Sequence, residues 1–149
     1  AKPGVANAFG VVGSDANAIE PGKRMLSSMS PSIVTRDGKV SLVLGTPGGS
    51  RIFTSIFQVL NNVYDFDLPL EKAVAAQRVH HQLLPKDTIY YDAHAPLTGE
   101  VADELKAMGY TLEDQGWLMG DIQAIRVDGT RLQTGSDPRG RGVGIVVKP

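Results

Sequence analysis

The chain has 149 residues, 42% of them hydrophobic and 21% charged, which is ordinary for one globular domain with a core of its own. A net charge of -1 provides no basic surface for nucleic acid or an anionic membrane, and no apolar run approaches the roughly 20 residues of a membrane-spanning helix. Because cysteine is absent, disulfides, thiolate nucleophiles and cysteine metal sites are excluded. With no clear linker, residues 1–149 are predicted to form a single domain.

Residues 1–22 are rich in glycine, alanine, asparagine and proline and lack a sustained periodicity. This composition predicts an irregular segment. Long ordered loops often lie over binding sites, so the segment is interpreted either as a lid or as a disordered leader. Phe9 is its only large aromatic residue.

Residues 23–31 place three hydroxyl groups between two cations and a predicted strand. Ser27 and Ser28 are adjacent, so in an extended chain their side chains face opposite ways. Both can reach one ligand only if the backbone turns there. The segment is therefore interpreted either as an ordinary serine-rich turn or as a turn that binds a carboxylate.

A β-hairpin is the clearest local structure. Residues 32–35 and 40–44 are apolar, β-branched runs that flank an Asp-Gly turn at Asp37 and Gly38. The second run is apolar at nearly every position, which predicts a central strand covered on both faces.

Residues 45–50 form a glycine turn, Gly-Thr-Pro-Gly-Gly-Ser, between this strand and a helix predicted from Arg51 to about Tyr64, with Ser50 as its N-cap. A strand that breaks at glycines before a helix leaves backbone N–H groups pointing outward, at the positive end of the helix dipole. Gly48 and Gly49 thus suggest a site for an anion, a carboxylate or an oxyanion. The alternative is a tight turn without a ligand. The pattern lacks the Gly-Lys-Ser/Thr of a P-loop and the glycine spacing of a dinucleotide fingerprint.

The remaining elements favour an α+β fold, because strands and helices come in clusters with hairpins. The adjacent His80 and His81 invite a metal hypothesis, but no acidic residue stands at ligand spacing, so hydrogen-bonding histidines are preferred and no metal is expected. Residues 135–139 are interpreted as a polar turn, and Trp117 is placed in a loop. The other predicted elements are a helix from Leu70 to about Arg78, strands at 89–91 and 110–112, a helix at 97–108 ended by Gly109, a hairpin of 122–127 with 131–134, and a final strand at 143–147.

Taken together, these segments resemble the small subunit of γ-glutamyltranspeptidases, also called γ-glutamyltransferases or glutathione hydrolases. They stand in family order and cover nearly the whole chain. One departure is Met25, where many members have proline. The matching segments are Ala1-Lys2-Pro3-Gly4, Gly13-Ser14-Asp15-Ala16-Asn17, Lys23-Arg24, Leu26-Ser27-Ser28-Met29-Ser30-Pro31, Gly45-Thr46-Pro47-Gly48-Gly49-Ser50-Arg51, Arg78-Val79-His80-His81-Gln82 and Ser136-Asp137-Pro138-Arg139.

The resemblance implies part of an N-terminal nucleophile hydrolase fold, a four-layer αββα sandwich with mainly antiparallel sheets. It implies a precursor that cleaves itself into a large and a small subunit, whose new N-terminal threonine attacks γ-glutamyl amides such as glutathione. The γ-glutamyl group then passes to an amino acid, a peptide or water, and no cofactor is involved.

The resemblance also assigns roles to single residues. Gly48 and Gly49 would supply the N–H groups of the oxyanion hole, in agreement with the pattern of the glycine turn. Ser27 and Ser28 would hold the α-carboxylate of the γ-glutamyl donor. Residues 3–14 correspond to the lid loop of the family, and Phe9 falls where its aromatic gate lies.

The nucleophilic threonine of the family, and the segment that recognises the donor's α-amino group, have no counterpart in this chain. The chain alone is therefore expected to be inactive, and its expected partners are the large subunit and the rest of the small subunit. Exposed strand edges are expected to favour self-association. Family resemblance implies a periplasmic or secreted location. The alternatives are a carboxylate-binding module that catalyses nothing and a related acylase such as cephalosporin acylase, although Ser27 and Ser28 argue for γ-glutamyl substrates.

Overall fold

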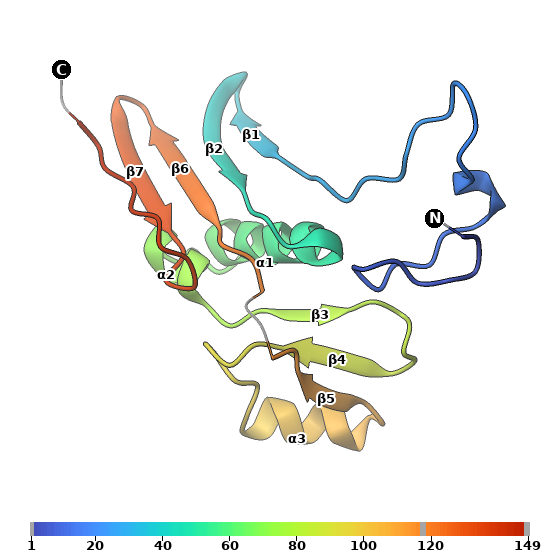
Figure 1. The fold of residues 1–149 in the computed structure, drawn as a ribbon. Helices are drawn as coiled ribbons and strands as arrows, with labels where there is room; N and C mark the ends of the chain where they lie inside the picture. The colour runs from blue at the N-terminus through green and yellow to red at the C-terminus, as the bar shows by residue number, and fades with distance from the viewer. Residues whose placement is uncertain (1, 117–118, 148–149) are drawn as a thin grey trace.

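The computed structural model describes residues 2–116 and 119–147, and this part of the chain contains two β-sheets (Figure 1). The strands are β1 (Ser32–Arg36), β2 (Lys39–Gly45), β3 (Val79–His81), β4 (Thr88–Tyr91), β5 (Thr111–Asp114), β6 (Gln123–Asp128) and β7 (Arg131–Ser136). The larger sheet has the order β1-β2-β6-β7 and is antiparallel throughout. The smaller sheet has the order β3-β4-β5, and only its β4–β5 pair is parallel. The prediction of an α+β fold with mainly antiparallel sheets is confirmed.

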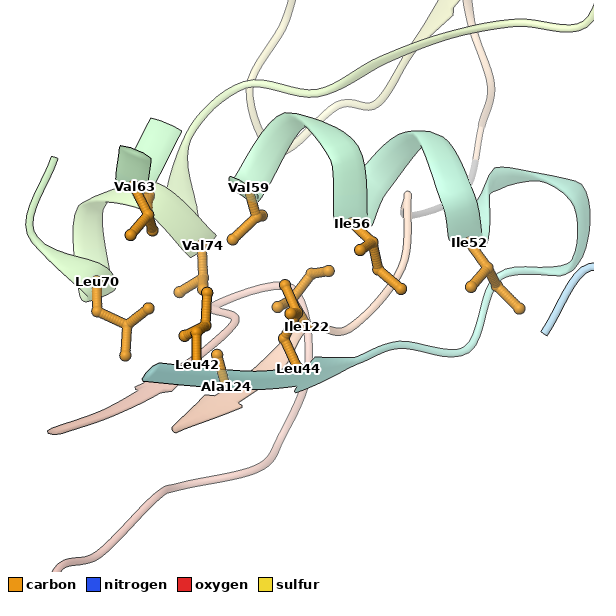
Figure 2. Packing of buried hydrophobic residues seen from close by; sticks show 11 residues of the cluster. Leu42, Leu44, Ile52, Ile56, Val59, Val63, Leu70, Val74, Ile122 and Ala124 are labelled. Atoms are coloured by element: carbon orange, nitrogen blue, oxygen red, sulfur yellow. The ribbon is translucent and has the colours of Figure 1, made fainter. Parts of the chain in front are cut away.

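Two helices cover one face of the larger sheet. They are α1 (Ile52–Tyr64) and α2 (Leu70–Ala75), whereas α3 (Glu100–Ala107) packs on the smaller sheet. Figure 2 shows the apolar side chains of α1 and α2 pointing onto those of β2 and β6. Burying one such leucine, isoleucine or valine side chain stabilises the fold by about 1.5–3 kcal/mol. The buried cluster is made of Leu42, Leu44, Ile52, Ile56, Val59, Val63, Leu70, Ala73, Val74, Ile122 and Ala124.

The opposite face of the larger sheet is only partly covered, because residues 142–145 lie against Gln123 and Thr134 at its β6–β7 side. β2 is central, as predicted, but the prediction that it is covered on both faces is wrong. Side chains alternate along a strand, so Leu42 and Leu44 point inward while Val43 points outward and is 37% exposed. Ile33, which pairs with Val43, is 67% exposed, and Ile125 is 46% exposed. The apolar run thus reflects a second surface, which the described residues leave largely exposed.

Both predicted Asp-Gly hairpins are present. Asp37 and Gly38 adopt φ values of 52° and 74°, the positive pair that a two-residue hairpin turn requires. In the second hairpin Asp128 still pairs with Arg131, so the two turn residues are Gly129, with a φ of 58°, and Thr130, one position later than predicted. The Asp-Gly sequences predicted both hairpins because the backbone conformation of a tight turn depends on the few residues that form it.

Several predicted boundaries were wrong. Ser50 does not cap α1, because a 3₁₀ turn over Gly49–Arg51 precedes the helix and Arg51 takes the cap position without a side-chain bond. α2 ends at Ala75 rather than near Arg78, since Ala76 is already extended with a ψ of 159°. α3 begins at Glu100 rather than at Leu97, because Gly99 has a positive φ of 74°. Residues 143–147 form no strand, and Trp117 lies outside the described residues.

A buried ionic cluster joins the two sheets. It consists of Arg78, Asp92, Asp137 and Arg139, each at most 7% exposed. Arg139 Nε donates to Asp92 Oδ2 at 2.7 Å, and Arg139 Nη1 donates to Asp137 Oδ1 at 3.3 Å. Arg78 Nη2 donates to Asp137 Oδ2. Asp92 follows β4 and Asp137 follows β7, so the cluster connects the ends of strands from different sheets. The segment interpreted as a polar turn is therefore part of the interior.

The charges in this cluster balance, with two cations and two anions. Burial alone would raise the pKa of Asp92, but the hydrogen bond from Arg139, the N–H group of Met119 and the charge of Arg139 hold it below its usual value. Asp92 therefore stays ionised inside the protein, because the ionised form has every partner it needs.

Candidate functional site

The glycine turn (residues 45–50) presents two backbone N–H groups at the start of a helix. Gly48 has a φ of 145° and Gly49 a φ of 57°, conformations that residues with a side chain rarely adopt. The Arg51 N–H group donates to the Gly48 carbonyl at 3.1 Å and closes the 3₁₀ turn. Within residues 2–116 and 119–147, neither the Gly48 nor the Gly49 N–H group has a hydrogen-bond partner. Such unpaired donors at a helix start are suited to a negatively charged oxygen.

The two serines approach the same place. The Ser28 hydroxyl donates to the Gly49 carbonyl oxygen at 2.8 Å, which ties residues 27–29 to the glycine turn. The Met29 N–H group donates to Ser27 Oγ at 3.2 Å, so the backbone turns at this point. Ser27, Ser28, Gly49 and Phe9 all line one cavity of about 670 Å³. Gly48 is not on its wall, although it is the next residue along the turn.

The N-terminal segment (residues 2–22) forms a small hairpin loop with Phe9 near its tip. Asn7 and Val11 pair through a 3.0 Å backbone bond, and the Gly10 N–H group donates to the Asn7 carbonyl at 2.9 Å. The Asn7 side chain accepts from the N–H groups of Phe9 and Val11 at 2.9 and 3.1 Å. The Phe9 ring lies against Gly49, because a Cβ atom added to Gly49 would be only 2.6 Å from Phe9 Cδ1.

A chain of side-chain hydrogen bonds lies behind the glycine turn. Ser50 Oγ donates to Gln82 Oε1 at 2.6 Å, and His80 Nε2 bonds the same oxygen at 3.0 Å. His80 Nδ1 is 2.9 Å from Thr54 Oγ1 in α1. Gln82 Nε2 donates in turn to the Gly10 carbonyl at 2.7 Å. The preference for hydrogen-bonding histidines is thus confirmed for His80.

The comparison with known proteins decides the family, because the family model described as gamma-glutamyltranspeptidase matches residues 1–147. The chain belongs to the gamma-glutamyltranspeptidase family. It is 91% identical to the glutathione hydrolase proenzyme of Pseudomonas aeruginosa over its whole length and 47% identical to that of Escherichia coli over 93% of its length. It covers 27% and 23% of these proenzymes, respectively.

A solved gamma-glutamyltranspeptidase has the same fold. The structure from Pseudomonas nitroreducens, complexed with L-DON, is 92% identical and superposes with a TM-score of 0.95. The match covers 99% of this chain and 77% of that one. The present chain thus spans about a quarter of the proenzymes it matches and about three quarters of the solved chain.

Several residues that the sequence singles out in this gamma-glutamyltranspeptidase chain lie together in the structure, and other contacts near them were not predicted. The structure brings Phe9, Ser27, Ser28 and Gly49 to one cavity, with Gly48 beside it. The hydrogen bonds through Ser50 and Gln82 were not predicted. The spacing offered a signal, because residues two positions apart in an extended chain, such as His80 and Gln82, point to the same side.

Among the described residues, no helix has the length and apolar character that crossing a membrane requires.

The surroundings of His80 favour its neutral form. Burial lowers its pKa, the hydrogen bond with Gln82 opposes this, and the charges of Arg51 and His81 lower the pKa further. Because Gln82 Nε2 donates to Gly10, its Oε1 atom must accept from His80, which places the ring hydrogen on Nε2. In the neutral ring Nδ1 is an acceptor, and Thr54 Oγ1, 2.9 Å away, shares its single hydrogen between this nitrogen and the Arg51 carbonyl oxygen at 3.0 Å.

Acid is expected to destabilise this protein through His80. Because its folded-state pKa lies below the ordinary 6.5, the unfolded chain takes up the proton first as the pH falls. The stability contribution is complete above pH 6.5 and is lost below it. Melting temperatures measured between about pH 8 and about pH 5 should fall less steeply for His80→Gln than for the wild type. The exposed His94→Gln serves as control and should keep the wild-type slope; equal slopes for all three proteins would contradict the assignment.

Proposed function

We propose that this chain is part of a γ-glutamyltransferase that cleaves glutathione and other γ-glutamyl amides and transfers the γ-glutamyl group to amino acids, peptides or water. The observation that carries the proposal is the convergence of Ser27, Ser28 and Gly49 on one cavity. Hydroxyl donors recognise the carboxylate of an amino-acid head group, and a backbone N–H group at a helix start stabilises an oxyanion. Family membership supports the same reading.

In this mechanism the nucleophile is a threonine hydroxyl supplied by a segment of the protein outside these residues. As its oxygen attacks the γ-carbonyl carbon, the threonine's own α-amino group takes up the hydroxyl proton. The carbonyl oxygen becomes an oxyanion that accepts hydrogen bonds from the N–H groups of Gly48 and Gly49. Collapse of this intermediate expels the amine, which receives that proton from the α-amino group and leaves a γ-glutamyl ester on the enzyme. Attack by a second amine or by water then forms the product and restores the threonine.

The two serines play different parts in holding the donor carboxylate. Ser28 already donates its single hydrogen to the Gly49 carbonyl, so it must rotate away from that oxygen to donate to a ligand. The Ser27 oxygen accepts from Met29, which leaves its hydrogen available for a carboxylate oxygen. Ser27 is therefore proposed as the stronger carboxylate donor. Phe9, held against Gly49, is proposed as the gate of a lid formed by residues 3–14.

The proposed partners are the large subunit and the remaining part of the small subunit. The open face of the larger sheet supports this, since its exposed apolar side chains suit the second sheet of an αββα sandwich. Residues 1–149 are proposed to act as one domain, with the buried ionic cluster joining the two sheets. An isolated copy is proposed to self-associate through its open face and edge strands. A periplasmic or secreted location is proposed on family resemblance.

The other functions weighed from the sequence are not favoured. A module that only binds a carboxylate, and an acylase such as cephalosporin acylase, both fit less well, because the relatives at 91% and 47% identity are glutathione hydrolase proenzymes. The direct test is release of chromophore from a γ-glutamyl anilide by the whole protein and by this chain alone. Activity is expected from the whole protein only. A whole protein that folds and releases nothing would overturn the proposal.

Replacing Ser27 by alanine in the whole protein should raise the KM for a γ-glutamyl anilide by about tenfold, because a charge-assisted hydrogen bond to the donor is lost. The matched control is Ser41→Ala, which loses a hydroxyl contact with Tyr64 in the larger sheet, away from the cavity. Its KM should stay at the wild-type value. Unchanged KM in Ser27→Ala would assign the carboxylate to other residues.

A further inference from the structure

The N-terminal segment is attached to the rest of the chain near Phe9 by few polar contacts. Gln82 Nε2 donates to the Gly10 carbonyl at 2.7 Å. Ser50 Oγ lies 3.3 Å from the Phe9 carbonyl, but its hydrogen is directed to Gln82 Oε1 at the shorter distance of 2.6 Å. The Gln82 amide is therefore the main hydrogen-bond donor from the body of the chain to the tip of this loop.

The orientation of the Gln82 amide is set by its surroundings. Its oxygen accepts from Ser50 and His80, and its nitrogen faces a carbonyl oxygen that can only accept. Rotating the amide by a half turn would place two oxygens against each other at Gly10 and would remove the acceptor for Ser50. His80 is itself fixed by Thr54 of α1. One amide thus connects the loop tip, the glycine turn and strand β3.

The position of the loop tip determines the shape of the site. Phe9 and Gln82 line the 670 Å³ cavity together with Ser27 and Ser28. The same two residues line a second cavity of about 410 Å³ on the side of Arg51 and Tyr90. The loop tip therefore divides the two spaces. If it moved away, the cavities would merge and Phe9 would leave Gly49.

We propose that Gln82 is a positioning residue that fixes the N-terminal segment through Gly10 and thereby keeps Phe9 across Gly49, on the wall of the donor site. Gln82 contacts no reacting atom in this role. Its effect on kinetics rests on the proposed γ-glutamyl transfer, whereas its effect on the loop does not depend on any activity.

The test is Gln82→Glu in the whole protein. A glutamate has the same length and can still accept from Ser50 and His80, but its carboxylate cannot donate to Gly10 and repels that carbonyl oxygen. Amide hydrogen exchange over residues 5–12 should become about tenfold faster, because the bond that holds the loop tip is lost. The KM for a γ-glutamyl anilide should rise by about tenfold, with a smaller change in kcat.

The matched control is Gln77→Glu. Gln77 Nε2 also donates to backbone carbonyls, those of Ala95 and Pro96 at 3.1 and 2.6 Å, but it lies away from the loop. This variant should leave exchange over residues 5–12 and KM unchanged. If Gln82→Glu does not fold, Gln82→Met removes the same donor without adding a charge and should give the same faster exchange.

The outcomes separate the two proposals. Wild-type exchange over residues 5–12 in a folded Gln82 variant would overturn the positioning role, whatever the kinetics. Faster exchange in a protein that never acts on γ-glutamyl anilides would support the positioning role and reject the proposed function. Faster exchange with an unchanged KM would show that the loop tip is fixed by Gln82 but does not shape the donor site, which also overturns the proposal.

Discussion

Gly49→Ala is expected to lower kcat for γ-glutamyl transfer by a factor on the order of 100 or more in the whole protein. Gly49 has a φ of 57°, which alanine adopts only with strain, and the new methyl group would be 2.6 Å from Phe9 Cδ1. The glycine turn and the Phe9 ring cannot both stay in their present positions. The strain at the φ of Gly49 and the contact with Phe9 together displace the turn or the ring, and the N–H group proposed to face the oxyanion acts only when it is held in position.

A matched control separates this effect from backbone strain alone. Gly129 has nearly the same φ, 58°, in the turn between β6 and β7, and an added Cβ there would meet nothing within 4 Å. Gly129→Ala should therefore carry a similar backbone cost and keep its activity. If Gly49→Ala retains most of its kcat, or if Gly129→Ala loses as much, the oxyanion role proposed for Gly49 is wrong.

Asp137→Asn is expected to lower the free energy of unfolding by about 3–5 kcal/mol. Asp137 is 1% exposed and accepts from both Arg78 and Arg139, as well as from the N–H group of Ile122 at 3.0 Å. When residue 137 carries no charge, Asp92 is the one carboxylate left in the cluster to balance the two buried guanidinium groups. The measurement is thermal or denaturant unfolding of the whole protein, followed by intrinsic fluorescence.

The control for that change is an exposed ion pair. Asp103 lies 3.8 Å from Lys106 on the surface of α3, and exposed pairs contribute about 0–1 kcal/mol. Asp103→Asn should leave the unfolding midpoint almost unchanged. A small effect of Asp137→Asn, similar to that of the control, would mean that the buried arginines find other partners and that the cluster does not hold the sheets together.

How far the sequence predicts this fold depends on the distance over which each signal acts. The Asp-Gly hairpins and the glycine turn were predicted because their backbone requirements lie within a few residues. The serine turn was one of two alternatives, since nothing local distinguishes a structural serine from one that lines a cavity. The family resemblance then selected residues, but roles for Ser27, Ser28, Gly48 and Gly49 stay predictions until they are measured.

The contacts that were missed join residues far apart in the chain. Gln82 and Gly10 are separated by 72 residues, and Arg78 and Asp137 by 59. A polar segment such as Asp137-Pro138-Arg139 looks like a surface turn unless its partners are known, since charged residues are buried only when paired. The hydroxyl of Ser50 was likewise assigned to helix capping, whereas it bonds Gln82, a residue 32 positions away.

The open apolar face of the larger sheet has a consequence for how such a protein is made. Ile33, Val43 and Ile125 lie side by side on neighbouring strands, and each is at least 37% exposed without its covering layer. A polypeptide that carries both layers in one chain holds them at an effective concentration on the order of millimolar from the moment of synthesis. If the proposed covering layer lies on the same polypeptide, translation of both as one chain supplies this exposed apolar face with its cover in a one-to-one ratio.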